Sequence, residues 1–200
     1  MKALRFTQIR QQRKRDCDML SRLCFIDIET TGSIFGFHEI TELGAVITTP
    51  DASEIIDTFQ TRIKPKYPER ITDVAKKLSD FSEETWVDAK ISNKEMWQNA
   101  SQFWTDCTPV CHNPTFERAF ITLAMVDAGI TSFGLDYHWI GTESLAWPFY
   151  LSGRIKKLSL LTLLNYFDLP PEPLPHRATN GALSCRSVYI KLIDALQKAT

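Results

Sequence analysis

The chain has 200 residues, of which 44% are hydrophobic and 24% are charged, and its net charge is −1. This size suits one domain with a substantial core, and no apolar run is long enough to cross a bilayer. Because the N-terminus is charged, it also lacks the features of a secretory signal. Five cysteines without paired spacing predict free thiols in a reducing compartment. We therefore expect a cytoplasmic protein without a membrane partner.

Residues 1–22 are strongly basic, with seven Lys or Arg against two Asp, so the rest of the chain is acidic. Such a run is either a solvated helix or arm, or a segment that binds phosphate. An acidic body is still compatible with nuclease chemistry, because bound cations offset clustered carboxylates. We divide the chain into a basic N-terminal helix or arm, residues 1–22, and one folded domain, residues 23–200.

Strand-forming residues dominate three early segments: 23–29, 40–49 and 54–63. Short loops join them, which predicts an antiparallel meander. From residue 71 to residue 106 the apolar spacing becomes helical, with breaks near Asp80 and at 91–93, and Asn93 begins a new helix.

The remaining elements alternate: a strand at 107–111, a helix that begins at Pro114, a strand at 137–140, helices around 144–150 and 158–167, and a final helix after the proline-rich loop 170–175. Proline suits the first turn of a helix, which supports the helix start at Pro114. The five tryptophans are expected in the core: Trp86, Trp97, Trp104, Trp139 and Trp147. Together these patterns predict an α/β fold with a mixed five-stranded sheet flanked by helices.

Two carboxylates, Asp27 and Glu29, stand two residues apart on an otherwise apolar strand that runs into a glycine turn. Side chains at this spacing share one face of a strand. Their mutual repulsion requires a compensating charge, which a hard divalent cation with oxygen ligands supplies. The alternative is a solvated face at the edge of the sheet.

Three ordered motifs resemble the DnaQ-like (DEDDh) family of 3′–5′ exonucleases, which includes proofreading polymerase subunits, ribonuclease T and oligoribonuclease. Residues 24–32 match the first motif, and 39–47 resemble the strand that follows it. Residues 111–120 resemble the second motif, and 176–182 resemble the third. The resemblance covers nearly the whole chain after the N-terminal segment.

The resemblance implies a ribonuclease-H-like fold and hydrolysis of terminal phosphodiesters with two Mg²⁺ or Mn²⁺ ions. Asp27 and Glu29 match the first two metal-binding carboxylates, and His176 matches the general base. The other reading of His176 is an ordinary loop histidine in a proline-rich turn. Substrate binding is expected at neighbouring positions of the same motifs: Thr30, Thr31, His112, Asn113 and Arg177.

Two positions depart from the family's carboxylate set. The third family aspartate is replaced by Glu117, which keeps the charge but is one methylene longer. It either supports a metal or its water, or is only a favourable acid in the first turn of a helix. The fourth family aspartate falls at Gly181, which offers no ligand. The two-metal site is therefore expected to be compromised at Gly181.

These observations predict a metal-dependent 3′–5′ exonuclease that acts on the 3′ ends of single-stranded DNA or RNA, with catalysis by Asp27, Glu29, Glu117 and His176. The alternative is an inactive exonuclease fold that binds nucleic acid or a partner protein. A third reading is a subunit that docks on a replication or repair protein. Nothing identifiable in the sequence reads a 2′-hydroxyl, so the choice between DNA and RNA stays open.

Overall fold

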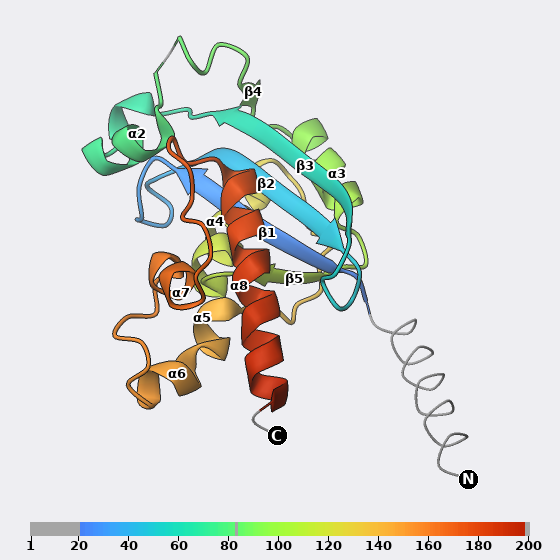
Figure 1. Cartoon of the computed structure of the whole chain (residues 1–200). Coiled ribbons are helices and arrows are strands. Elements are labelled where there is room, and N and C mark those ends of the chain that lie inside the picture. Colours follow the sequence, from blue (N-terminus) through green and yellow to red (C-terminus); the bar gives the residue numbers. More distant parts are fainter. Residues whose placement is uncertain (1–20, 83, 199–200) are drawn as a thin grey trace.

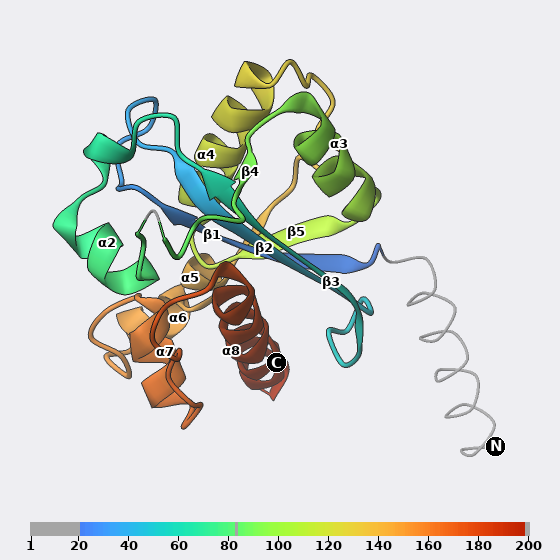
Figure 2. The same ribbon diagram turned by 90° about the horizontal axis from the view of Figure 1, so that it is seen from above.

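The computed structural model describes residues 21–82 and 84–198. A mixed six-stranded sheet forms its centre, with the strand order β4-β3-β2-β1-β5-β6. Helices cover both faces of the sheet. Helices α3 and α4 lie on one face, and α8 lies across the other with α5, α6 and α7 beside it (Figure 1, Figure 2). The α/β, ribonuclease-H-like class predicted from the sequence is confirmed.

The strands are β1 (Leu23–Thr30), β2 (Ile40–Thr48), β3 (Ile55–Lys64), β4 (Lys90–Ile91), β5 (Thr108–Cys111) and β6 (Ile140–Gly141). The predicted antiparallel meander of β1, β2 and β3 is confirmed. Strands β5 and β6 extend the sheet in parallel from β1. The predicted count of five strands is wrong, because β4 adds a sixth strand parallel to β3. Two residues are too short for a periodic signal, and the pairing partner of β4 is distant in sequence.

The helices are η1 (Pro68–Arg70), α2 (Asp73–Ser79), α3 (Lys94–Phe103), α4 (Pro114–Asp127), α5 (Thr142–Leu145), α6 (Trp147–Leu151), α7 (Leu160–Tyr166) and α8 (Ala178–Lys198). The predicted helix start at Asn93 is confirmed, since its side chain accepts a hydrogen bond from the Met96 N–H at 2.9 Å. The single helix expected around 144–150 is two short helices, with Pro148 in the first turn of α6. None of the helices in the described part of the chain combines the length and hydrophobicity of a membrane span.

The two faces of β1 enter different cores. Cys24, Ile26 and Ile28 pack with residues of α3 and α4, whereas Leu23 and Phe25 pack with residues of α8. Alternate residues of a strand point to opposite faces, so Asp27 and Glu29 continue the face that α8 covers. The fold thus places both acids between the sheet and α8.

Most of the tryptophans lie where the sequence predicted them. Trp86, Trp97 and Trp104 are buried, and Trp139 packs half-buried against the core. The prediction is wrong for Trp147, whose residue surface is 48% exposed. Its ring stacks on Tyr150 one helical turn later, with ring centroids 5.4 Å apart, so it is partly covered on the surface of α6.

Gly44 allows α8 to begin directly on the sheet. Strand β2 places Gly44 opposite Asp27. A Cβ atom at Gly44 would overlap the backbone of Ala178 and Thr179 and would lie 2.7 Å from the carbonyl oxygen of Ala178. The absence of a side chain at this position therefore sets how closely the start of α8 approaches Asp27.

We expect Gly44→Ala to push the start of α8 away from β2 and to lower the free energy of unfolding by about 1–3 kcal/mol, the usual cost of overpacking. Urea unfolding measures this change. The control is Gly153→Ala, where the φ of +72° adds backbone strain but no atom lies within 4 Å of the new Cβ. Unchanged stability in Gly44→Ala would contradict this role for Gly44.

Candidate active site

Three acids share the sheet face beneath α8. Asp27 and Glu29 come from β1, and Glu42 on β2 is the cross-strand partner of Glu29. Glu42 is fully buried, and its Oε1 accepts a 2.5 Å hydrogen bond from Gln60, whereas its Oε2 has no partner among the described residues. Sequence reasoning missed Glu42, because its position opposite Glu29 depends on the strand register.

Glu117 joins these acids from the first turn of α4. Its residue surface is only 5% exposed, and its Oε2 is buried without a hydrogen-bond partner in the described part of the chain. Burial raises the pKa of Glu117 from 4.5 to about 7. A buried acceptor without a donor is costly, so this oxygen fits a ligand position better than a structural one.

The acids raise one another's pKa. Burial raises the pKa of Asp27 well above its ordinary value, and the charges of Glu117, Glu29 and Glu172 raise it further. Burial also raises the pKa of Glu29 to about 7, with added contributions from Glu42 and Glu172. Arg177 opposes this shift for Glu29, but the group as a whole is negative.

Glu172 is a second acid that sequence reasoning missed. It is half-buried in the loop before α8, and its charge raises the pKa of both Asp27 and Glu29. Burial raises the pKa of Glu172 itself, and His176 opposes that shift. The available signal was a single acid between prolines, four residues before the motif histidine.

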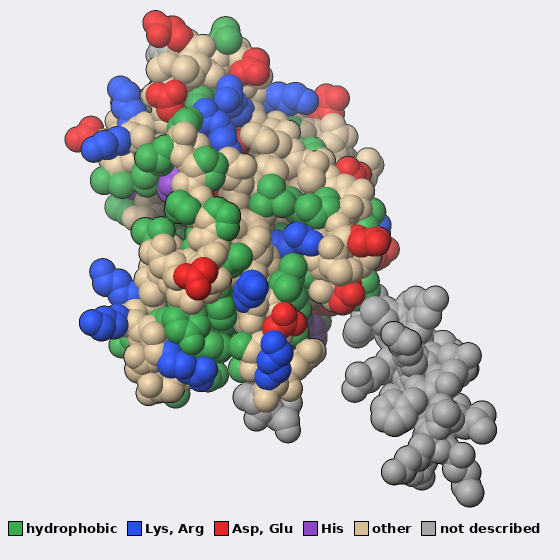
Figure 3. Space-filling model, viewed as in Figure 1, with side chains coloured by type: hydrophobic (Ala, Val, Ile, Leu, Met, Phe, Trp, Pro, Cys, Tyr) green, Lys and Arg blue, Asp and Glu red, His purple; other side chains and the backbone are tan. Residues whose placement is uncertain are grey.

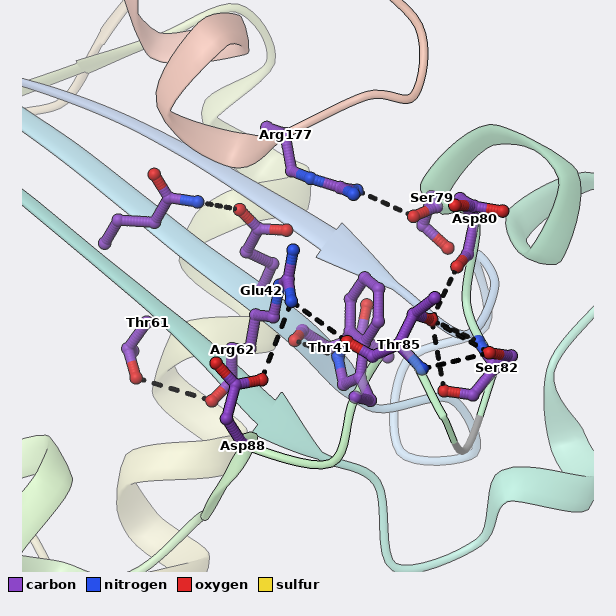
Figure 4. A network of polar contacts seen from close by, with 12 residues as sticks. Thr41, Glu42, Thr61, Arg62, Ser79, Asp80, Ser82, Thr85, Asp88 and Arg177 are labelled. Atoms are coloured by element: carbon purple, nitrogen blue, oxygen red, sulfur yellow. Dashed lines mark hydrogen bonds and ion pairs between the residues drawn. The ribbon is translucent and has the colours of Figure 1, made fainter.

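The segment that carries His176 and Arg177 is anchored on α2. The His176 N–H donates to the Leu78 carbonyl oxygen at 2.9 Å, and Arg177 Nη1 donates to the Ser79 carbonyl oxygen at 2.7 Å. Figure 4 shows the Arg177 side chain reaching from the start of α8 toward Ser79, close to Glu42. The guanidinium therefore holds the loop in place and offsets the acids, while its predicted phosphate contact stays a prediction.

The other expected substrate-binding residues already have partners within the fold. Thr30 Oγ1 donates to the Gly32 carbonyl oxygen at 2.8 Å, and buried Thr31 accepts from the Glu39 N–H at 2.9 Å. Asn113 caps α4 by accepting from the Thr115 N–H. His112 Nδ1 lies 2.9 Å from Thr142 Oγ1, and burial lowers its pKa. The predicted role of these four residues in substrate binding stays a prediction.

Basic side chains do not form one continuous patch on the face of the molecule that Figure 3 shows, where Lys and Arg are scattered among Asp and Glu. Residues 1–20 lie outside the described part of the chain, so the prediction of a basic arm over residues 1–22 stays a prediction. The four described cysteines, Cys24, Cys107, Cys111 and Cys185, are free and buried.

The donor set fits a hard divalent cation, although the site is not closed. Asp27, Glu29 and Glu117 offer only carboxylate oxygens, the donors that Mg²⁺ and Mn²⁺ prefer, and Glu117 Oε2 has no other partner among the described residues. Across residues 21–82 and 84–198, no three His, Cys, Asp or Glu side chains converge closely enough to hold a metal ion as they stand. The carboxylates would have to turn toward one another to bind one.

Comparison with known proteins relates the chain, rather than the individual site residues, to a family. The family model described as "Exonuclease" matches residues 24–125. The chain is 29% identical over 172 residues to a PolC-type DNA polymerase III from Pediococcus pentosaceus, and 30% identical over 173 residues to that of Bacillus cereus. Each match covers 86% of this chain but only 11% of the polymerase, so the chain spans about a ninth of the length of these relatives.

Solved structures share the fold. The nuclease domain of 3′hExo, a DEDDh family member bound to rAMP, superimposes with a TM-score of 0.72 at 16% identity, over 88% of this chain and 94% of that one. Exonuclease I of E. coli, in complex with a dT13 oligonucleotide, superimposes with a TM-score of 0.73 at 11% identity, over 90% of this chain and 44% of that one. This fold agrees with the family-model match over residues 24–125, which is just over half of the chain, and the chain belongs to the DnaQ-like 3′–5′ exonuclease family.

Proposed function

We propose that the chain is a metal-dependent 3′–5′ exonuclease that hydrolyses terminal phosphodiesters of single-stranded nucleic acid. The observation that carries this proposal is the group of buried and half-buried acids Asp27, Glu29 and Glu117, which Arg177 offsets only in part and whose pKa values are all raised. A protein without a cation-dependent role would gain little from keeping such a group, because buried like charges are costly.

The same family members support the substrate class. One structural neighbour holds rAMP and another holds a dT13 oligonucleotide, and the sequence relatives are PolC-type DNA polymerases III. We infer that the substrate of this chain is single-stranded nucleic acid and that its partner is a replication or repair protein. Its buried free thiols fit the reducing cytoplasm, where we place its activity.

Each residue has a distinct role in this mechanism. When bound by Asp27, Glu29 and Glu117, Mg²⁺ or Mn²⁺ would supply an activated water and stabilise the leaving oxygen. His176, whose charge lowers the pKa of Glu172, would act as general base and take the proton of the attacking water. Arg177 holds the His176 segment against α2 and partly neutralises Glu29. The backbone hydrogen bond from His176 to Leu78 supports the role of His176 as general base, because it restrains the segment that carries this histidine.

One observation favours a second candidate function. Gly181 gives the site no carboxylate from α8, and the described acids form no closed metal site. A chain that had lost turnover could still bind a nucleic-acid end through the same surface. This inactive binding module is the alternative to be tested against hydrolysis.

We expect the full chain to shorten 5′-labelled single-stranded DNA or RNA from the 3′ end in Mg²⁺ or Mn²⁺, one nucleotide at a time, because hydrolysis of the terminal phosphodiester regenerates a 3′ end. A gel ladder reads the products. A chelator, or a phosphorothioate at the 3′ terminus, is expected to stop the reaction. Retarded but uncut substrate would support the binding module instead, and early release of the 5′ label would contradict the direction.

A further inference from the structure

Position 181 on α8 lies directly above Asp27. A Cβ atom built on Gly181 would overlap Asp27 Oδ2 and would lie 3.1 Å from Glu172 Oε1. The carboxylates of Asp27 and Glu172 therefore flank the point where the side chain of a family aspartate would begin. A carboxylate from the preceding loop already stands where α8 itself provides none.

We propose that Glu172 supplies the carboxylate that position 181 lacks, and that it turns with Asp27 and Glu117 to bind a divalent cation, since the three carboxylates do not converge as they stand. The cation site is the one of the proposed function, on which this assignment rests. Glutamate has a longer side chain than aspartate, which allows a residue outside the helix to reach the space above Asp27.

The loop that carries Glu172 is built to hold it in place. Four prolines surround it: Pro170, Pro171, Pro173 and Pro175. Proline fixes φ and so reduces the conformational freedom of a loop. The C-terminal end of the loop is anchored by the backbone hydrogen bond from His176 to Leu78 on α2. The Glu172 carboxylate therefore reaches the site from a restrained backbone.

The Glu172 carboxylate has no structural task that would explain its half-buried position. In the described part of the chain, no hydrogen bond or salt bridge engages it. Its environment is negative, since Glu172 raises the pKa of Asp27 and Glu29, and only His176 opposes the effect of burial on its own pKa. A divalent cation would compensate these charges, and oxygen donors suit it.

Glu117 provides an independent sign of a missing ligand. Its Oε2 is buried and unpartnered among the described residues, and the residue surface is 5% exposed. Of the neighbouring charges, that of Glu117 has the largest effect on Asp27. The free oxygen of Glu117 and the carboxylate of Glu172 thus approach Asp27 from two different elements, α4 and the loop before α8.

Binding of Mn²⁺ to the full chain, measured by electron paramagnetic resonance, tests this assignment without relying on activity. We expect Glu172→Gln to weaken Mn²⁺ binding by about tenfold or more, because a neutral amide replaces a charged ligand. The matched control is Glu54→Gln, an exposed glutamate in the turn at the far end of β2, which should bind as the wild type does. Circular dichroism verifies that each variant is folded.

A second variant tests whether Glu172 stands in for position 181. Adding Gly181→Asp to Glu172→Gln returns a carboxylate to α8, but its Cβ would overlap Asp27 Oδ2, so Mn²⁺ affinity returns only if Asp27 shifts. Restored affinity would support the assignment, and a Glu172→Gln protein that binds Mn²⁺ as tightly as the wild type would overturn it. If Glu172→Gln loses Mn²⁺ affinity while the wild type cuts no substrate, the Glu172 assignment stands and the proposed function fails.

Discussion

Asp27→Asn is expected to lower the exonuclease rate by about 10³-fold while leaving the fold intact. Asp27 is the acid that Glu117, Glu29 and Glu172 all influence, so it lies at the centre of the group. Losing a metal-binding carboxylate removes several kcal/mol of charge stabilisation in the transition state, and about 4 kcal/mol corresponds to about 10³ in rate.

Asparagine keeps the shape of the side chain and removes its charge. Because Asp27 is buried among acids, its pKa is raised and its charged form is disfavoured in the metal-free protein. We therefore expect Asp27→Asn to be at least as stable as the wild type in chelator. The combination of lost rate and retained stability distinguishes a catalytic defect from unfolding, which would lower both.

Initial rates on 5′-labelled single-stranded DNA, with thermal unfolding of the same preparations, measure both effects. Asp57→Asn serves as control, because this exposed aspartate on β3 undergoes the same change of charge on the same sheet. Equal nucleotide release by wild type and Asp27→Asn would show that the activity does not come from this site, and the exonuclease mechanism would be wrong.

Local signals in the sequence predicted most of the fold. The alternating residues of β1 and the helix starts at Asn93 and Pro114 depend on neighbours a few residues away. Strand β4 was missed because only its pairing with distant Ile63 and Lys64 makes two residues a strand. Trp147 was misplaced because a short surface helix carries no periodicity that separates core from surface.

In the candidate site, too, local sequence signals predicted some residues, whereas others depend on contacts between distant segments. The motif pattern identified Asp27, Glu29 and Glu117, whose placement follows from a strand and from the start of a helix. Glu172 carries no motif, and its approach to position 181 depends on how the proline-rich loop docks on α2. The sequence therefore revealed the missing carboxylate at Gly181, but the only sign of Glu172 was a single acid between prolines, which does not show that it lies beside position 181.

Stability of the metal-free protein is expected to depend on Glu117 and on pH. The pKa of Glu117 is about 7 in the folded chain, against 4.5 when unperturbed, and burial is the main cause. Since the folded state binds this proton more tightly, the chain is stabilised below pH 4.5, and that stabilisation is lost as pH rises through about 7. The loss is on the order of 3 kcal/mol, at about 1.4 kcal/mol per pKa unit.

Glu117→Gln removes this titration. At pH 8 in chelator, the free energy of unfolding of the variant should therefore exceed that of the wild type by up to about 3 kcal/mol. The side chain is almost fully buried, so little solvent screening reduces the effect. Urea unfolding between pH 4 and pH 8 measures it. The difference between the two proteins reports the titration of Glu117 together with its coupling to Asp27, whose pKa Glu117 raises.

Added Mn²⁺ should make the wild type more stable than Glu117→Gln, the reverse of the order expected in chelator. The wild type gains binding free energy in the folded state, whereas Glu117→Gln has lost a ligand and gains less. Glu54→Gln, an exposed glutamate, should follow the wild type under both conditions. Two outcomes would contradict the view that the Glu117 carboxylate destabilises the metal-free fold and serves to bind a cation. One is a Glu117→Gln variant whose free energy of unfolding changes with pH as that of the wild type does, and the other is a variant less stable than the wild type at pH 8 in chelator.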